Sequence, residues 1–496
     1  MSRIVIIGGG ISGLTAGIYA RLAGFEAEIC EKNAVPGGEC TGWDRQGYHI
    51  DNCIHWMIGT APGTELHKVW ETTGALGSVD VRRRNVMYAS EKDGARLNLW
   101  DYADQTEAEL LALSPEDEKA IRELMADCRL AEKVVIPAGT PPELLKGLEG
   151  LKLLGESGPI FKLWGKYKGM DTADLAAKFR HPLIRAMLSD FCPADSPAHS
   201  FPIAYGNFLS GDGGVPAGGS KAMALRMAER FRSLGGVLRC GAPVEKVILE
   251  NGGIASVRLA DGTEVTADWF IWAADPFYLF EKLIGTQYMD KIFRGYYTKP
   301  EDYKIYAMFQ AAWAVDDAED LLNGEINLDV SDLRTESWMG ARVSLKTYSY
   351  EPSFAPEGKQ ILQALWGCDR SAYPYFEELA ADKEAYEAKK VEFAGLLEKK
   401  ITERWPEYAG KLTLLDSWTP VTYERYCNAW QGYNQACVFT KRALKNPYPS
   451  AYVKGIENLL LAGQWLSAPG GLPGAAIQGK YAVQRILHQE GRHINL

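Results

Sequence analysis

Short runs of β-branched and aliphatic residues alternate with helical periods and glycine turns in three segments: the first ~70 residues, roughly residues 215–290, and the last ~40. In the first segment, the apolar run from Arg3 to Ile7 predicts a strand. Residues 14–23 follow a helical period, and residues 27–30 predict a second strand. The pattern therefore predicts one α/β domain that is discontinuous in the sequence.

The two stretches between these segments have a different pattern. Residues 105–200 are dense in Leu, Ala, Glu and Lys, while residues 300–425 mix aromatic strands with a charged helical run from Asp382 to Arg404. A chain of 496 residues also exceeds the length that one hydrophobic core usually spans. We therefore expect an inserted second domain. The predicted boundaries are 1–75, 205–290 and 455–496 for the first domain, and 76–204 and 291–454 for the inserted one.

Composition and charge narrow the class of protein. Hydrophobic residues make up 46% of the chain and charged residues 24%, as in folded globular proteins. The net charge of -10 argues against a nucleic-acid partner. The nine cysteines are scattered, odd in number and never spaced Cys-x-x-Cys, which favours reduced thiols over disulfides or a metal site. These features predict a cytoplasmic protein without a bound metal.

No apolar run approaches the ~18 residues that a membrane-spanning helix needs, and Met1-Ser2-Arg3 leads directly into the first strand without a leader. Residues 142–170 allow two interpretations, because leucines recur there at helical spacing and lysines outnumber glutamates. The first is a helix at a membrane surface. The second is an ordinary amphipathic helix packed on the core, which the four glycines between residues 147 and 158 favour.

The sequence Gly8-Gly9-Gly10-Ile11-Ser12-Gly13 joins the first predicted strand to the first predicted helix. In this context a G-x-G-x-x-G pattern predicts a dinucleotide site. Gly8 permits the tight turn, Gly10 lets the backbone approach the pyrophosphate, and Gly13 lets helix and strand pack closely. Ser12 belongs to the same turn, and the helix N-terminus attracts the phosphates.

Further residues extend this site. Glu31 ends the second strand, 21 residues after Gly10, where a carboxylate accepts hydrogen bonds from a ribose diol. Near the C-terminus, a strand leads into a glycine turn and then into a helix opened by Pro and Gly, whose positive end stabilises a reduced flavin. This second cluster favours FAD over NAD. The remaining predicted contacts are Lys32, Gly37, Gly38, Gly463, Gln464, Pro473 and Gly474.

The middle segment supplies a third part: Gly218-Gly219, a helix to Leu234, a strand from Val244, a hairpin at Asn251-Gly252-Gly253, and the strand from Trp269. Together the three segments, roughly 40% of the chain, resemble the FAD domain of the phytoene desaturase and retinol saturase branch of the amine oxidase-like flavoproteins. The resemblance implies a Rossmann-like, GR2-type FAD-binding domain with an inserted α+β substrate domain. It also implies a cofactor contact at Val244.

The stretch from Gly37 to Gly59 looks most like retinol saturases. Two residues depart from the pattern of the relatives. Glu39 stands where many of them carry Arg, and Gln464 stands where many flavoproteins carry an acid. Both departures put a pyrophosphate or ribityl contact in question, although the Gln464 amide still forms hydrogen bonds.

The resemblance implies hydride exchange between flavin N5 and a carbon of an apolar isoprenoid, retinoid or lipid, which saturates or desaturates a carbon–carbon bond. The protein would add one acid or base, for which the candidates are His55, Asp212 and Tyr205. Each also has a structural interpretation: His55 and Tyr205 as core side chains, Asp212 as a turn former. Six aromatic residues either line an apolar tunnel or pack in the core: Phe201, Tyr205, Phe208, Trp430, Tyr433 and Phe439.

Three other functions remain open. Reduced flavin supports a redox-neutral double-bond isomerase, and the run from Trp430 to Tyr433 would suit the aromatic cage of an amine oxidase. A prenyl carrier of the same fold performs no redox chemistry, but the intact glycine turn and Glu31 speak against it. No second G-x-G-x-x-G occurs between residues 100 and 300, so we expect no separate nicotinamide domain. The electron partner is left open.

Overall fold

The computed structural model describes residues 2–443 and 448–496, apart from the side chains of Leu148, Glu149 and Lys152. One of its sheets has five parallel strands, and the first strand along the chain lies in the middle of this sheet. This order is typical of dinucleotide-binding folds. The strands, in spatial order, are β10 (Val237–Arg239), β2 (Glu26–Cys30), β1 (Arg3–Ile7), β14 (Trp269–Trp272) and β22 (Leu459–Leu461).

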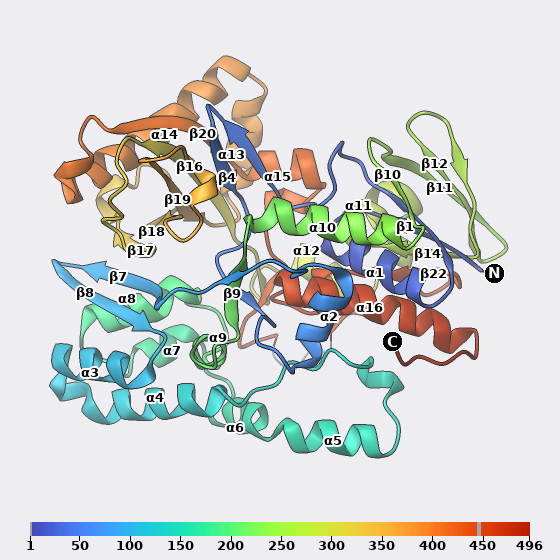
Figure 1. Ribbon diagram of the computed structural model, residues 1–496, viewed down its shortest axis with the longest axis horizontal. Helices are drawn as coiled ribbons and strands as arrows, with labels where there is room; N and C mark the ends of the chain where they lie inside the picture. Colours follow the sequence, from blue (N-terminus) through green and yellow to red (C-terminus); the bar gives the residue numbers. More distant parts are fainter. Residues whose placement is uncertain (1, 444–447) are drawn as a thin grey trace.

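Both faces of this sheet are covered, which explains why its strands are almost continuously apolar. Ile4 and Ile6 pack on one face with three helices, while Val5 and Ile7 pack on the other with a three-stranded antiparallel sheet. Figure 1 shows the three helices beside the sheet. The helices are α1 (Ile11–Leu22), α10 (Gly219–Ser233) and α16 (Gly471–Gln489), and the antiparallel strands are β11 (Val244–Glu250), β12 (Gly253–Leu259) and β13 (Glu264–Val265).

A second sheet of seven strands lies apart from the first in the view of Figure 1. Its strands pair antiparallel, except that β17 and β7 pair in parallel. In spatial order they are β20 (Leu412–Trp418), β16 (Ala307–Val315), β19 (Gln360–Cys368), β18 (Met339–Thr347), β17 (Glu325–Asp329), β7 (Val86–Lys92) and β8 (Ala95–Trp100).

Helices from distant parts of the chain pack on this second sheet. The charged helical run forms α14 (Lys383–Arg404), which buries Phe393 and Leu397 against the sheet. Its N-cap Asp382 accepts hydrogen bonds from two backbone N–H groups, a usual way to begin a helix. Near β7 and β8 lie α3 (Ala103–Leu113), α4 (Glu118–Ala131), α7 (Thr172–Ala176), α8 (Pro182–Phe191) and α9 (Ser200–Leu209), and α13 (Ala372–Ala380) accompanies α14.

The predicted fold class is confirmed: a Rossmann-like α/β unit is combined with a mixed α and β part. Strand β1 spans the predicted residues, while α1 begins at Ile11, three residues earlier than expected, because Gly10 already serves as its N-cap. The strands of the parallel sheet come from the predicted ranges 1–75, 205–290 and 455–496, and those of the seven-stranded sheet from the other two. The exact domain boundaries stay a prediction.

Two smaller sheets and six further helices are also present in the described part of the chain. A two-stranded hairpin consists of β3 (Gly42–Arg45) and β4 (Tyr48–Asp51). Strand β9 (Gly213–Pro216) pairs with β5 (Met57–Ile58) and with β6 (Val81–Arg82). Further helices are α2 (Glu65–Thr73), α5 (Leu148–Glu156), α6 (Gly158–Lys166), α11 (Pro276–Tyr278), α12 (Lys291–Thr298) and α15 (Pro420–Cys427).

Candidate functional site

A cavity of about 1300 Å³ begins at the carboxyl ends of β1, β2 and β14 and reaches the second sheet. In open α/β sheets, ligands bind at these strand ends, where the strand order reverses. At one end the cavity is lined by Gly8, Gly10, Ser12, Glu31, Lys32, Gly37, Gly38, Val244, Gly463, Gln464 and Pro473. Eleven of the thirteen predicted cofactor residues thus line one cavity, and Gly13 and Gly474 do not.

The glycine turn divides its tasks between ligand and fold. A Cβ on Gly13 would lie 1.9 Å from the Gly8 carbonyl oxygen, so Gly13 permits close contact between α1 and β1. A Cβ on Gly10 would meet nothing nearer than 3.8 Å, so this position is free of protein and open to the cavity. The buried Ser12 hydroxyl forms no hydrogen bond within the described residues. An open glycine and an unpaired hydroxyl at a helix N-terminus fit a pyrophosphate.

Glu31 and Lys32 lie next to this turn. The buried Glu31 carboxylate accepts hydrogen bonds from the Gly9 N–H at 2.6 Å and from the Asn33 N–H at 2.7 Å. It therefore lies at the strand end where a ribose diol would bind. The Lys32 ammonium donates to the Arg425 carbonyl oxygen at 2.7 Å, and burial lowers its pKa. Lys32 thus links the residues after strand β2 to the last turn of α15.

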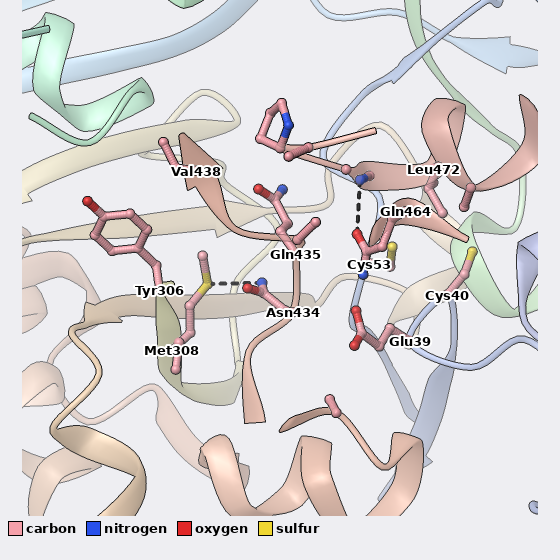
Figure 2. A pocket seen from close by; sticks show the side chains of 18 of the residues that line it. Glu39, Cys40, Cys53, Tyr306, Met308, Asn434, Gln435, Val438, Gln464 and Leu472 are labelled. Carbon is pink, nitrogen blue, oxygen red and sulfur yellow. Dashed lines mark hydrogen bonds between the residues drawn. The ribbon is translucent and has the colours of Figure 1, made fainter. Parts of the chain in front are cut away.

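The C-terminal cluster places the start of α16 at the cavity. The Gln464 side-chain oxygen accepts a hydrogen bond from the Gly471 N–H at 3.0 Å, which ties the turn to the first residue of the helix (Figure 2). Leu472 and Pro473 line the cavity. A Cβ on Gly474 would approach the Ser467 hydroxyl to 2.6 Å, so Gly474 serves packing. The predicted second helix end therefore does face the ligand cavity.

His55 lines the middle of the cavity and is paired with a residue that sequence reasoning missed. Its Nδ1 lies 3.0 Å from a carboxylate oxygen of Glu325, which comes from β17 of the second sheet. A carboxylate on one ring nitrogen orients the imidazole and selects its tautomer. Because 270 residues separate the two positions, no local signal could have revealed the pair.

The Glu325 carboxylate is embedded among cations. The Arg84 guanidinium lies 3.5 Å away, and the Lys346 ammonium nearby donates to the Ile54 carbonyl oxygen at 2.7 Å. Burial by itself would raise the pKa of Glu325, but His55, Arg84 and Lys346 together hold it well below its usual range. Burial lowers the pKa of Lys346 to about 8. Glu325 is therefore an ionised anchor at neutral pH.

The structure does not bring Asp212 and Tyr205 to this cavity. The Asp212 carboxylate accepts hydrogen bonds from the Gly59 and Ala61 N–H groups at 2.9 and 2.7 Å, and borders a separate small pocket. The Tyr205 hydroxyl is buried and donates to the Trp100 carbonyl oxygen at 2.7 Å. Their positions thus favour the structural interpretation of both residues, whose part in catalysis is untested.

Glu39, at the position where many relatives carry Arg, turns its carboxyl group toward the cavity (Figure 2). Burial, followed by the charge of Asp275, raises its pKa well above the usual range. Burial also raises the pKa of Asp275 to about 7, although the N–H groups of Trp430 and Phe277 oppose this shift. A raised pKa favours the protonated carboxyl group, which can donate a proton, so Glu39 is a second acid candidate.

The cavity has aromatic residues on its wall, but they are mostly not the six that the sequence offered for a tunnel. Of the six aromatic candidates, only Phe439 lines the cavity. Trp430 and Tyr433 pack in a core cluster, and the Arg370 guanidinium lies over the Trp430 ring at 4.8 Å. Because Arg370 already covers the Trp430 ring, Trp430 and Tyr433 are not arranged as an aromatic cage for an amine. The cavity wall instead contains Trp56, Tyr88, Trp164, Phe191, Trp272, Tyr278, Tyr306, Trp338, Tyr426 and Tyr448.

The described residues contain neither a membrane-spanning helix nor a metal site. No helix there is long and apolar enough to cross a membrane. No group of three or more His, Cys, Asp or Glu side chains is arranged to hold a metal ion within residues 2–443 and 448–496.

Comparisons with known proteins agree with this geometry. Residues 6–73 match the family model of the NAD(P)-binding Rossmann-like domain. The chain is 24% identical to the prolycopene isomerase of Daucus carota, over 85% of this chain and 70% of the relative. It is 22% identical to a neurosporene-forming phytoene desaturase of Rhodobacter capsulatus, over 98% and 94% of the two chains.

Solved structures show the same fold. Cyclohexylamine oxidase from Brevibacterium oxydans superimposes with a TM-score of 0.61 over 99% of this chain and 100% of that one, at 15% identity. An oxidoreductase from Methanosarcina mazei superimposes with a TM-score of 0.58 over 97% of this chain and 100% of that one, at 17% identity. The chain thus has the fold of these solved structures. Its homologues are phytoene desaturases and prolycopene isomerases, which confirms the predicted resemblance to phytoene desaturases.

Proposed function

We propose that this protein is an FAD-dependent enzyme that saturates or desaturates a carbon–carbon bond in an apolar isoprenoid or related lipid. The observation that carries the proposal is the single cavity, which joins the glycine turn to an aromatic wall. FAD would be held by the Gly8 to Gly13 turn, Glu31 and the start of α16. When bound, it would supply hydride exchange at its N5 atom.

The chain's own residues would position the substrate, exclude water and manage one proton. His55 would hold that proton at the nitrogen that faces away from Glu325, and Glu325 would orient the ring. Glu39 would hold a second proton on its carboxyl group. The relatives include both desaturases and isomerases, so a redox-neutral isomerase is the second candidate.

Absorbance and product mass test the proposal. Purified protein should be yellow and absorb near ~450 nm, as a bound flavin does. After photoreduction, incubation with a polyene should give either a product two hydrogens heavier or an isomer of unchanged mass. Protein that stays colourless after addition of FAD would contradict the enzyme proposal and favour a carrier.

Variants at the two acid candidates test their roles. His55→Ala and Glu39→Gln should retain the flavin spectrum and slow turnover at least ~100-fold, in line with loss of proton transfer. Tyr306→Phe, a change on the same cavity wall away from the proton path, is the matched control and should slow turnover by less than ~10-fold. Full activity in either acid variant would remove that residue from the mechanism.

We also propose that residues 142–170 contact a membrane surface. Helices α5 and α6 leave large apolar side chains exposed, with Leu151 at 65% and Phe161 at 47%. Lysines such as Lys162 are exposed on the same stretch, while Ile160 and Trp164 of α6 line the cavity. Exposed apolar residues beside lysines suit an anionic bilayer, and α6 would place the cavity mouth at the lipid.

Vesicle sedimentation tests this contact. The protein should sediment with phosphatidylglycerol vesicles more than with phosphatidylcholine vesicles, because the lysines attract anionic headgroups. The double variant Leu151→Glu/Phe161→Glu should lower the bound fraction at least about fivefold. Val391→Glu changes an equally exposed side chain on α14 and should leave it unchanged. If the double variant sediments with the vesicles as much as the wild type does, the proposed membrane contact is refuted.

A further inference from the structure

Two cysteines face each other at the open end of the hairpin β3–β4. In the hairpin register Gly42 pairs with Asp51, and the Asn52 N–H donates to the Thr41 carbonyl oxygen at 3.0 Å. Cys40 and Cys53 each lie one residue beyond this last backbone pair, and a hydrogen bond joins their two thiols. Two thiols in contact at the end of a hairpin are close enough for a disulfide to form.

The two thiols also interact with each other and with the cavity. A hydrogen bond to Cys53, followed by burial, raises the pKa of the Cys40 thiol well above its usual range. Cys40 is 2% exposed, whereas Cys53 is partly exposed. Both residues line the large cavity, and Figure 2 shows them on the wall that also carries Gln464 and Leu472. The pair therefore lies at the part of the cavity that the proposed cofactor would occupy.

We propose that Cys40 and Cys53 form a redox pair that exchanges two electrons with the flavin. The inference rests on the proposed function. In the forward direction two S–H bonds break and one S–S bond forms, while two electrons and two protons pass to oxidised flavin. The reverse reaction returns them. Such a pair would act as an electron store in a chain that has no second G-x-G-x-x-G between residues 100 and 300.

The asymmetry of the pair suits this chemistry. Thiol–disulfide reactions begin at an accessible thiol. Cys53 is partly exposed and Cys40 is buried, so Cys53 would react first and Cys40 would close the bond. Closure costs little chain entropy, because β3 and β4 already hold the two ends together.

Mapping of the disulfide tests the pair independently of activity. The purified protein is treated with diamide, a thiol oxidant, then unfolded, alkylated with iodoacetamide and digested. We expect a linked Cys40–Cys53 peptide in the wild type, none in Cys53→Ser, and the linked peptide again in Cys192→Ser, a control cysteine that lines the same cavity. Absence of the linked peptide from the wild type would overturn the proposal.

Anaerobic reduction tests the exchange with flavin. Diamide-treated protein, freed of reagent, should take up about four electrons per flavin from dithionite, and Cys53→Ser about two, because a disulfide and a flavin each accept a pair. An uptake of about two electrons by the wild type would overturn the proposal even if the linked peptide forms. Failure of the proposed function would give a different result, because the purified protein would then show no flavin absorbance.

Discussion

Replacing Gly13 and Gly10 by alanine separates what the glycine turn does for the fold from what it does for a ligand. In Gly13→Ala, the new Cβ lies 1.9 Å from the Gly8 oxygen, whereas unbonded atoms of this kind stay at least 3.0 Å apart. To remove this clash, α1 and β1 must separate by about 1 Å. The other side of α1 gives no room, because a Cβ on Gly479 of α16 would already lie 2.3 Å from the Ser12 carbonyl oxygen.

The expected cost of Gly13→Ala is about 3 kcal/mol, the upper end of the usual range for overpacking a core, and a large fraction of a typical stability. Gly10→Ala is the matched control. Its backbone angles, φ −72° and ψ −177°, suit alanine, and its Cβ meets no protein atom within 3.8 Å. Without cofactor, the free energy of unfolding of Gly10→Ala should therefore lie within about 0.5 kcal/mol of the wild-type value. Its affinity for FAD should fall at least ~10-fold, because the Cβ occupies the approach to the pyrophosphate.

Thermal unfolding followed by circular dichroism, with and without FAD, and a fluorescence titration with FAD measure both effects. Normal stability of Gly13→Ala would refute the packing argument. Normal FAD affinity of Gly10→Ala would refute the position of the pyrophosphate.

Three further variants test the electrostatics. Glu325→Gln should lower stability at pH 7 by roughly 3 kcal/mol, since buried cations lose their partner, and urea unfolding should show this loss shrinking as the pH falls below 4.5, where the unfolded carboxyl becomes protonated. Lys480→Met should stabilise at pH 7 by roughly 2 kcal/mol, because burial lowers the pKa of Lys480 from 10.5 to about 8 and its charged form is unfavourable in the fold. The gain should vanish between pH 8 and 10.5, as the folded wild type loses that proton before the unfolded chain does; a gain independent of pH would contradict this cause. Asp212→Asn should lower the melting temperature by a few degrees and leave the flavin spectrum unchanged, because its carboxylate holds backbone N–H groups outside the cavity; an altered spectrum would count against that placement.

The sequence by itself determined the features that depend on neighbouring residues. Strand β1, the turn to α1 and the charge-rich α14 follow from periodicity, glycine sterics and capping, which act over a few residues. The resemblance of the three α/β segments to one known FAD domain also indicated that they join into one sheet. Most residues that line the cavity beside the glycine turn were predictable for this reason.

Only the tertiary structure decided which distant groups meet. His55 was a candidate by position, but its partner Glu325 comes from a sheet of the inserted region, and Asp212 and Tyr205 turn away from the cavity into other hydrogen bonds. Residues 142–170 form helices as expected, yet the exposure of Leu151 and Phe161 shows only in the packed molecule. Periodicity determines that a residue lies on an apolar face, and what covers that face depends on chain segments hundreds of residues away.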